Sequence, residues 1–132
     1  MKRGNERGAA AVEFAILLPV LMLILMGIVE FGMIMYSREL ITNASREGAR
    51  AGIVQTAAKP TAGDIGNVVM NYLTNTGLTM ANVESPVDVV GAGGAAPNTL
   101  TVTVRYRYDF FVPAILGLGN SINLAGQTVM RH

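Results

Sequence analysis

Apolar residues dominate the first part of the chain and predict a membrane-length helix. Residues 9–30 are almost entirely apolar, and the stretch from Phe14 to Val29 carries no charge. As an α-helix, the path from Glu13 to Glu30 would cover about 25 Å at 1.5 Å per residue. This is slightly less than the hydrocarbon core of a bilayer, about 30 Å, and flanking residues can supply the difference. We therefore predict a transmembrane helix segment over residues 9–30.

Pro19 interrupts the backbone hydrogen bonding that this apolar helix would otherwise have. A proline inside a helix lacks one donor and clashes with the carbonyl four residues earlier, which here belongs to Ala15. We expect a helix kink at Pro19. It is either an ordinary proline of a membrane helix, which such helices tolerate, or a functional hinge.

An amphipathic continuation of the helix is predicted over residues 31–59, with apolar residues on one side and charges on the other. Ala44, Gly48 and Gly52 form a stripe of small residues at four-residue spacing, which lets another backbone approach closely. We predict that this stripe mediates helix packing, either against the chain's own sheet or against a helix of another subunit. Pro60 should end the helix.

A small α+β head is predicted over residues 60–132. After a short linker, apolar residues at helical spacing indicate a second, short amphipathic helix, with Asp64 as its N-cap and Gly77 as its C-cap. The apolar residues of this helix are Ile65, Val68, Val69, Tyr72 and Leu73.

Three strands should follow this second helix. Val87 and Val89 begin a short strand, and a glycine-rich turn leads to Leu100–Phe110, where apolar and polar residues alternate strictly. A last strand from about Ile122 to Met130 completes the set. The predicted fold class is thus α+β, with a long N-terminal helix whose first half is transmembrane, a second short helix and a small three-stranded antiparallel sheet.

Basic residues flank only one side of the apolar run. Residues 1–8 contain Lys2, Arg3 and Arg7 against the single acidic residue Glu6, whereas the rest of the chain is nearly balanced. A basic flank on one side of a single apolar segment keeps that side in the cytoplasm. We therefore expect a single-pass protein with a cytoplasmic N-terminus and an exported C-terminal domain.

Few residues in the chain are suited to catalysis or ligand binding. There is no cysteine, and the one histidine is the terminal His132. We find no catalytic triad, metal-ligand spacing or phosphate loop, and we predict no catalytic residue, metal, cofactor or small-molecule substrate. The net charge of +1 and the scattered basic residues predict no nucleic-acid partner. Arg105 and Arg107 fit a solvated sheet face better than a nucleic-acid or glycan surface.

The N-terminal residues resemble the class III signal sequences of the type IV pilin superfamily. Those sequences have a short basic leader, a glycine, four apolar or small residues and then Glu-Phe. Gly8, Ala9 to Val12, Glu13 and Phe14 match that spacing. In finer detail, the chain is similar to the TadE-like minor pseudopilins of the Flp (tight adherence) branch, in segments 10–15, 18–19, 27–32 and 45–50. Many TadE-like domains carry a cysteine pair that this chain lacks, so we expect no disulfide in the head.

The resemblance implies how the N-terminus is processed. An inner-membrane aspartic prepilin peptidase would remove the cleavable leader, residues 1–8, by cutting between Gly8 and Ala9. Glu13 and Phe14 would act in processing and assembly. The new amino group of Ala9 would lie one helical turn from Glu13, and in a fibre Glu13 could meet the amino group of a neighbouring subunit. That attraction strengthens as water is excluded.

These observations lead to the hypothesis of a minor pilin-like structural subunit, not an enzyme, in the assembly of Flp-type (type IVb) pili for surface adherence. The expected partners are the inner membrane, the prepilin peptidase, other pilin subunits and the pilus assembly machinery. The protein would reside in the bacterial inner membrane with residues 60–132 in the periplasm, or be incorporated into a pilus. The alternative is an uncleaved, single-pass membrane-anchored periplasmic adaptor or binding module of a secretion system, which would keep Met1 as its N-terminus.

Overall fold

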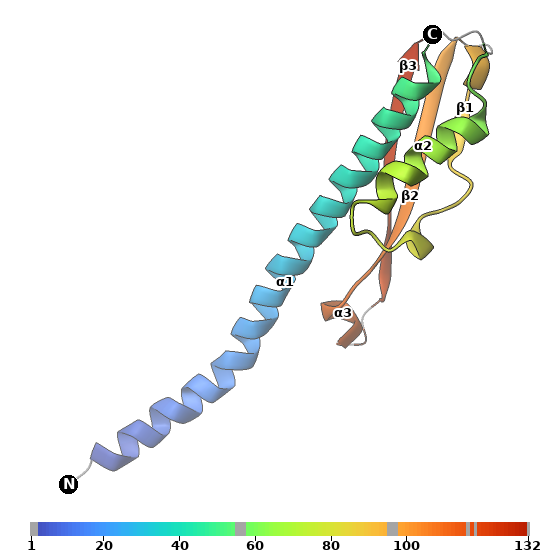
Figure 1. The fold of residues 1–132 in the computed structure, drawn as a ribbon. Helices are drawn as coiled ribbons and strands as arrows, with labels where there is room; N and C mark the ends of the chain where they lie inside the picture. Colours follow the sequence, from blue (N-terminus) through green and yellow to red (C-terminus); the bar gives the residue numbers. More distant parts are fainter. Residues whose placement is uncertain (1–2, 55–57, 95–97, 116, 118, 132) are drawn as a thin grey trace. The chain divides into compact units, whose positions relative to one another are not determined.

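The computed structural model describes residues 3–54, 58–94, 98–115, 117 and 119–131. Its main elements are three helices and three strands, with two short 3-10 turns (Figure 1). They run in the order α1 (Arg3–Gly52), α2 (Ala62–Thr74), η1 (Met80–Asn82), β1 (Asp88–Val90), η2 (Ala92–Gly94), β2 (Thr99–Asp109), α3 (Val112–Ile115) and β3 (Ser121–Arg131). The predicted α+β class is confirmed.

Two compact units make up the chain. The N-terminal unit consists of Met1–Met33 together with Phe110–Asn120, which is the connection between β2 and β3. The head unit consists of Ile34–Asp109 and Ser121–His132. Helix α1 contributes its first part to the N-terminal unit and its second part to the head unit.

Helix α1 is a single 50-residue helix that includes Pro19 in its interior. It begins at Arg3, so the described part of the basic leader is helical, and the kink at Pro19 stays a prediction. The helix ends at Gly52, earlier than the predicted end at the 57–59 region, and residues 55–57 lie outside the described residues. A glycine costs about 1 kcal/mol in a helix relative to alanine, which favours an end here.

Residues that are distant in sequence pack so closely against α1 at Gly52 that a side chain at this position would clash with them. A Cβ atom added at Gly52 would lie 2.3 Å from Leu100 Cδ2 and 2.7 Å from Ile65 Cδ1. The chain then turns away after a last helical hydrogen bond from Ile53 N–H to the Ala49 carbonyl, at 3.2 Å. The predicted end was wrong because it rested on Pro60 alone.

Helix α2 begins with a capping box. The Thr61 side chain accepts a hydrogen bond from the Asp64 backbone at 3.2 Å, and the Asp64 carboxylate accepts one from the Thr61 backbone at 3.0 Å. The N-cap is therefore Thr61 and not Asp64, which occupies the third helical position. Asn75 is the C-cap in place of Gly77, which adopts φ +79° beyond the helix end.

The sheet has the order β1-β2-β3 and is antiparallel throughout, as predicted. Val89 pairs with Val102, and Tyr106 pairs with Leu124. The turn between β1 and β2 requires glycine at position 91. That residue has φ +85°, and a Cβ atom there would lie 2.0 Å from the Thr99 carbonyl oxygen.

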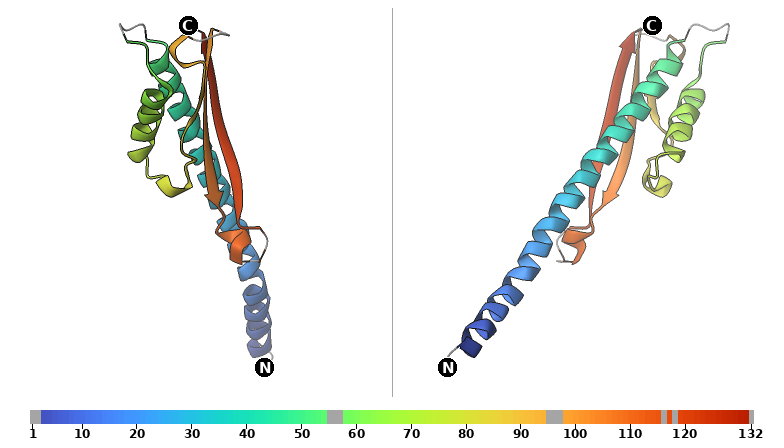
Figure 2. Two further views of the ribbon diagram at one scale, coloured as in Figure 1. Left: turned by 90° about the vertical axis from the view of Figure 1, so that its right-hand side faces the viewer. Right: turned by 60° about the vertical axis from the view of Figure 1, so that its left-hand side comes forward.

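The hydrophobic core lies in the head unit, where α2 and the second part of α1 cover the same face of the sheet (Figure 2). The predicted apolar side of β2 and the two helices contribute equally to the fully buried apolar residues. The fully buried apolar residues are Ile41, Ala44 and Ala49 of α1, Ile65, Val69 and Leu73 of α2, and Leu100, Val102 and Val104 of β2.

Candidate functional site

The residues that we predicted to act in processing and assembly lie on the exposed first part of α1. Gly8, Ala9, Glu13 and Phe14 are all exposed, and a Cβ atom added at Gly8 would meet nothing within 4 Å. Ala9 and Glu13 are four residues apart in a continuous helix, so they lie on the same helix face one turn apart. The structure thus brings together the proposed new N-terminus and the carboxylate.

An uninterrupted apolar surface follows Glu13 along α1. Large apolar side chains from Phe14 to Val29 are exposed, and the most apolar 18-residue window of the helix has a mean hydropathy of 2.7 with none of it buried inside the protein. By length and composition this helix could cross a membrane. Such a surface needs apolar surroundings, because exposed apolar patches beyond a few hundred Å² are rare on soluble monomers. The N-terminal unit is therefore compatible with single-pass membrane anchoring.

Glu30, directly after the uncharged run, is the one buried carboxylate among the described residues, with 8% of its surface exposed. Its Oε2 accepts a hydrogen bond from the Val112 backbone N–H at 3.2 Å, and its Oε1 accepts one from the Phe111 backbone N–H. These donors lie at the start of α3, where backbone N–H groups lack partners within the helix and a negative charge is favourable. Glu30 therefore fastens the connection between β2 and β3 to α1 within the N-terminal unit.

Sequence reasoning missed this role of Glu30. The available signal was a second carboxylate at the far end of the apolar run, matched by a distant uncharged segment, residues 110–119. The sequences around Glu30 and at residues 110–119 do not indicate that the two segments make contact. A carboxylate that accepts hydrogen bonds from backbone N–H groups requires no particular side chain in its partner.

The small-residue stripe of α1 packs within the head unit. A Cβ atom added at Gly48 would lie 2.5 Å from Val69 Cγ2 and 3.5 Å from Val102 Cγ1. Ala44 is fully buried, and Gly52 lies against Leu100 as described above. The chain's own α2 and β2 fill the space beside these glycines, which agrees with the first of the two interpretations given for the stripe.

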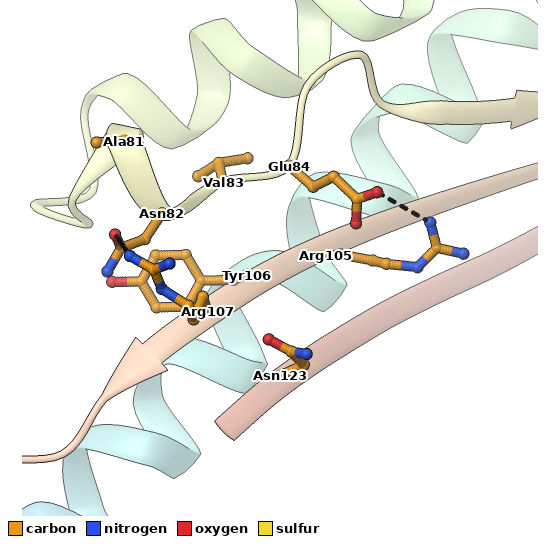
Figure 3. Close-up of a pocket in the computed structure, with 8 residues that line it drawn as sticks. All are labelled: Ala81, Asn82, Val83, Glu84, Arg105, Tyr106, Arg107 and Asn123. Carbon is orange, nitrogen blue, oxygen red and sulfur yellow. Dashed lines mark hydrogen bonds and ion pairs between the residues drawn. The ribbon is translucent and has the colours of Figure 1, made fainter. Parts of the chain in front are cut away.

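A small open pocket of about 240 Å³ lies beside β2 in the head unit (Figure 3). Arg105 lies 3.6 Å from Glu84 and 3.5 Å from Asp88, and Arg107 lies 3.2 Å from Asp109. Glu84, Arg105 and Arg107 line the pocket together with Ala81, Asn82, Val83, Tyr106 and Asn123, and Asp88 and Asp109 lie outside it. The neighbouring carboxylates balance both guanidinium groups, so this face has the character of a solvated sheet surface with exposed ion pairs.

No metal centre is evident in the part of the chain that the structure describes, where no three His, Cys, Asp or Glu side chains gather closely enough to hold an ion.

A long, exposed, apolar N-terminal helix followed by an α+β head is compatible with a pilin-like membrane protein. Residues 8–50 match the family model described as TadE-like protein, and over this segment the chain is similar to that family. The match lies within α1 and includes Glu13, Glu30 and the first two residues of the small-residue stripe, Ala44 and Gly48. It confirms the resemblance seen in the sequence, and the likeness to this family indicates a pilin-like protein associated with Tad pili. No curated protein and no solved structure matches the chain.

Proposed function

We propose that this protein is a minor pilin-like subunit that takes part in the assembly of Flp-type pili for surface adherence. The observation that carries the proposal is the exposed apolar helix with Glu13 near its start, within the segment that matches the TadE-like family. In this proposal α1 anchors the protein in the inner membrane, and the head lies in the periplasm. Other pilin subunits and the pilus assembly machinery are the partners.

Processing by a prepilin peptidase is the first step of the proposed function. The enzyme would cut between Gly8 and Ala9, where Gly8 has no Cβ to obstruct the peptidase and a Cβ added there would meet nothing within 4 Å beyond the helix's own backbone. The cut removes Lys2, Arg3 and Arg7 and leaves an amino group next to the apolar surface. Loss of the basic leader allows the N-terminus to leave the cytoplasmic membrane surface.

Assembly is the second step, and it depends on Glu13. A fibre built from α1 helices would be apolar along its axis, and an apolar bundle does not by itself fix how far one helix slides past the next. A Glu13 carboxylate that pairs with the Ala9 amino group of a neighbouring subunit would fix that register. A buried polar residue fixes register in coiled coils for the same reason.

The experiment is mass spectrometry of the protein extracted from membranes of cells that contain a working prepilin peptidase. We expect a mature chain that begins at Ala9. The variant Gly8→Val should remain full length, because its Cβ and methyl groups obstruct the cut, and Gly4→Val in the leader is the matched control that should be processed normally. An intact Met1 terminus in the unaltered protein would contradict the proposal.

One observation favours the alternative, an uncleaved membrane-anchored adaptor. The described leader residues belong to α1 without a break, and a peptidase needs the backbone at its cut to leave the helix. In this second proposal Met1 stays in place and the protein never enters a fibre. The same mass measurement distinguishes the two, and cell-surface pili tested for the protein by immunogold labelling provide an independent check.

The proposed orientation has its own test. A reporter that is active only after export, fused at His132, should be active because the basic leader keeps the other end of α1 in the cytoplasm. A fusion that is stable but inactive would show that the head is not exported and would contradict the proposed orientation.

A further inference from the structure

We infer that the connection between β2 and β3 is a second membrane contact, which enters the headgroup region of the bilayer beside the point where α1 leaves it. The contact consists of residues 110–115, termed the tip segment below. The inference rests on the proposed membrane anchoring of α1. It adds a lipid-binding surface, with lipid of the same bilayer as its partner.

The composition of this connection is the first observation. From Phe110 to Gly119 the sequence contains no charged or polar side chain, whereas Asp109 and Asn120 on either side are polar. Phe111 exposes 62% of its surface. The connection at the other end of β2, residues 91–98, consists of glycine, alanine, proline and asparagine and carries no large apolar side chain. A hairpin connection of this sheet therefore does not need large apolar side chains to join two strands.

The position of the tip segment is the second observation. The backbone N–H groups of Phe111 and Val112 donate hydrogen bonds to the Glu30 carboxylate. Figures 1 and 2 show α3 beside α1. Glu30 is the first charged residue after the apolar run that would span the bilayer. The tip segment is thus held at the depth where the helix meets the headgroups. Phe31, which exposes 63% of its surface, marks the same level on α1.

The hydrogen bonds of Glu30 are the third observation. Near the hydrocarbon region little water is present to satisfy free backbone N–H groups, and each unsatisfied group is costly there. The first N–H groups of a helix have no partner within it. The buried Glu30 carboxylate supplies that partner for α3, and the Phe110 N–H donates to the Asn120 carbonyl at 2.8 Å and closes the connection. These hydrogen bonds satisfy backbone N–H groups of the tip segment, which a region of low water content requires.

The absence of cysteine from the sequence makes a direct test simple. Three single-cysteine variants of the full-length protein, each labelled with the fluorophore NBD, are placed in vesicles of phosphatidylethanolamine and phosphatidylglycerol. Ala114→Cys reports on the exposed side of α3, and Leu21→Cys reports on the apolar run. Glu47→Cys is the control, because it is exposed and about 25 Å beyond Glu30 along α1 at 1.5 Å per residue.

The expected result is a graded depth. The label at position 114 should show blue-shifted emission and strong quenching by lipids that carry a nitroxide near the headgroup. The label at position 21 should be quenched best by a nitroxide deep in the acyl chain, and the label at position 47 by neither. Adding Phe111→Ser to the position 114 variant should return its emission toward that of position 47. Because Phe111 is mostly exposed, this substitution leaves the head core intact.

Two outcomes would overturn the inference while the proposed function stands. One is a label at position 114 that behaves like that at position 47 while position 21 remains in lipid. The other is protection at position 114 that appears only at high protein-to-lipid ratio, which would identify a second copy of the chain as the occupant. If position 21 is also in water, the membrane anchoring itself fails, and with it the proposed function.

Discussion

Gly126 of β3 lies directly against the backbone of α1 at Ile41. A Cβ atom at position 126 would lie 2.8 Å from both the Ile41 carbonyl carbon and the Thr42 nitrogen. Next to this point, Ser45 Oγ and Thr128 Oγ1 form a hydrogen bond of 2.7 Å. The long helix and the last strand therefore approach each other as closely as two backbones allow, and a glycine is needed for that approach.

Gly126→Ala should destabilise the head. The atoms that the new methyl group would meet belong to the backbone and cannot move aside as a side chain would, and overpacking of this kind costs about 1–3 kcal/mol. We expect a lower midpoint in the unfolding of the full-length protein in detergent by urea, followed by tyrosine fluorescence. Gly66→Ala is the matched control. Its Cβ would lie 3.9 Å from Val87 Cβ, so helix α2 should keep or gain stability.

The head should depend on the second part of α1 for its stability. Ile41, Ala44 and Ala49 are buried in the same core as β2, and a segment of fewer than about 80 residues rarely supplies more than 3–5 kcal/mol from one core. A truncated chain that begins at Phe31 should therefore unfold cooperatively, and one that begins at Pro60 should not. Thermal unfolding by circular dichroism measures both. Equal midpoints would show that the sheet does not need the helix.

The pH dependence of stability should include a contribution from the capping box of α2. Hydrogen bonds from the side chain and then the backbone of Thr61 lower the pKa of Asp64 below its ordinary value of 3.8. A pKa that is lower in the folded state means that the contribution is fully present above the unfolded pKa and is lost as the pH falls through the folded pKa.

The variant Asp64→Asn isolates this effect. Its melting temperature should be lower than that of the unaltered protein at pH 7, and the difference should shrink as the pH falls below 3.8 because Asp64 then becomes protonated. Asp109→Asn, at an exposed ion pair on the sheet, is the control with a smaller expected effect. A difference that grows on acidification would contradict the assigned role of Asp64.

Local patterns predicted the elements of this fold better than their ends. The strict alternation from Leu100 to Phe110 identified β2 because only a half-buried strand produces it. The end of α1 at Gly52 depends on Leu100 and Ile65, which are distant in sequence and invisible to a local pattern. The Thr61 cap was within reach, since Thr-x-x-Asp precedes the apolar face of α2 and acts as a capping box.

The candidate sites include one relationship that the sequence predicts and one that it does not. The arrangement of Ala9 and Glu13 on one face follows from helical spacing alone, so the sequence sufficed to place them. The bond from Phe111 to Glu30 joins residues that are 81 positions apart. Only the folded chain shows that the second carboxylate of the apolar run holds the tip segment, because neither segment has a pattern that specifies the other.

Glu13 should be required for pilus formation beyond its part in processing. In the proposed fibre its carboxylate pairs with the amino group of a neighbouring subunit in apolar surroundings. Glu13→Ala would leave that amino group without its partner, a loss of about 3–5 kcal/mol for a buried pair. We expect the Ala variant to be inserted and at least partly cleaved, yet to form no pili. Glu13→Asp, which keeps the charge but shortens its reach, should give an intermediate number.

The measurement combines an immunoblot for cleavage with a count of surface pili for each variant. A strain that lacks the protein is examined in parallel, because it shows whether pili depend on this subunit at all. Leu17→Ala serves as the matched control: it removes apolar bulk one turn further along the same helix face but leaves the carboxylate in place. If fully cleaved Glu13→Ala protein supports normal pili while the deletion strain has none, Glu13 is only a processing signal, and the proposed register role is wrong.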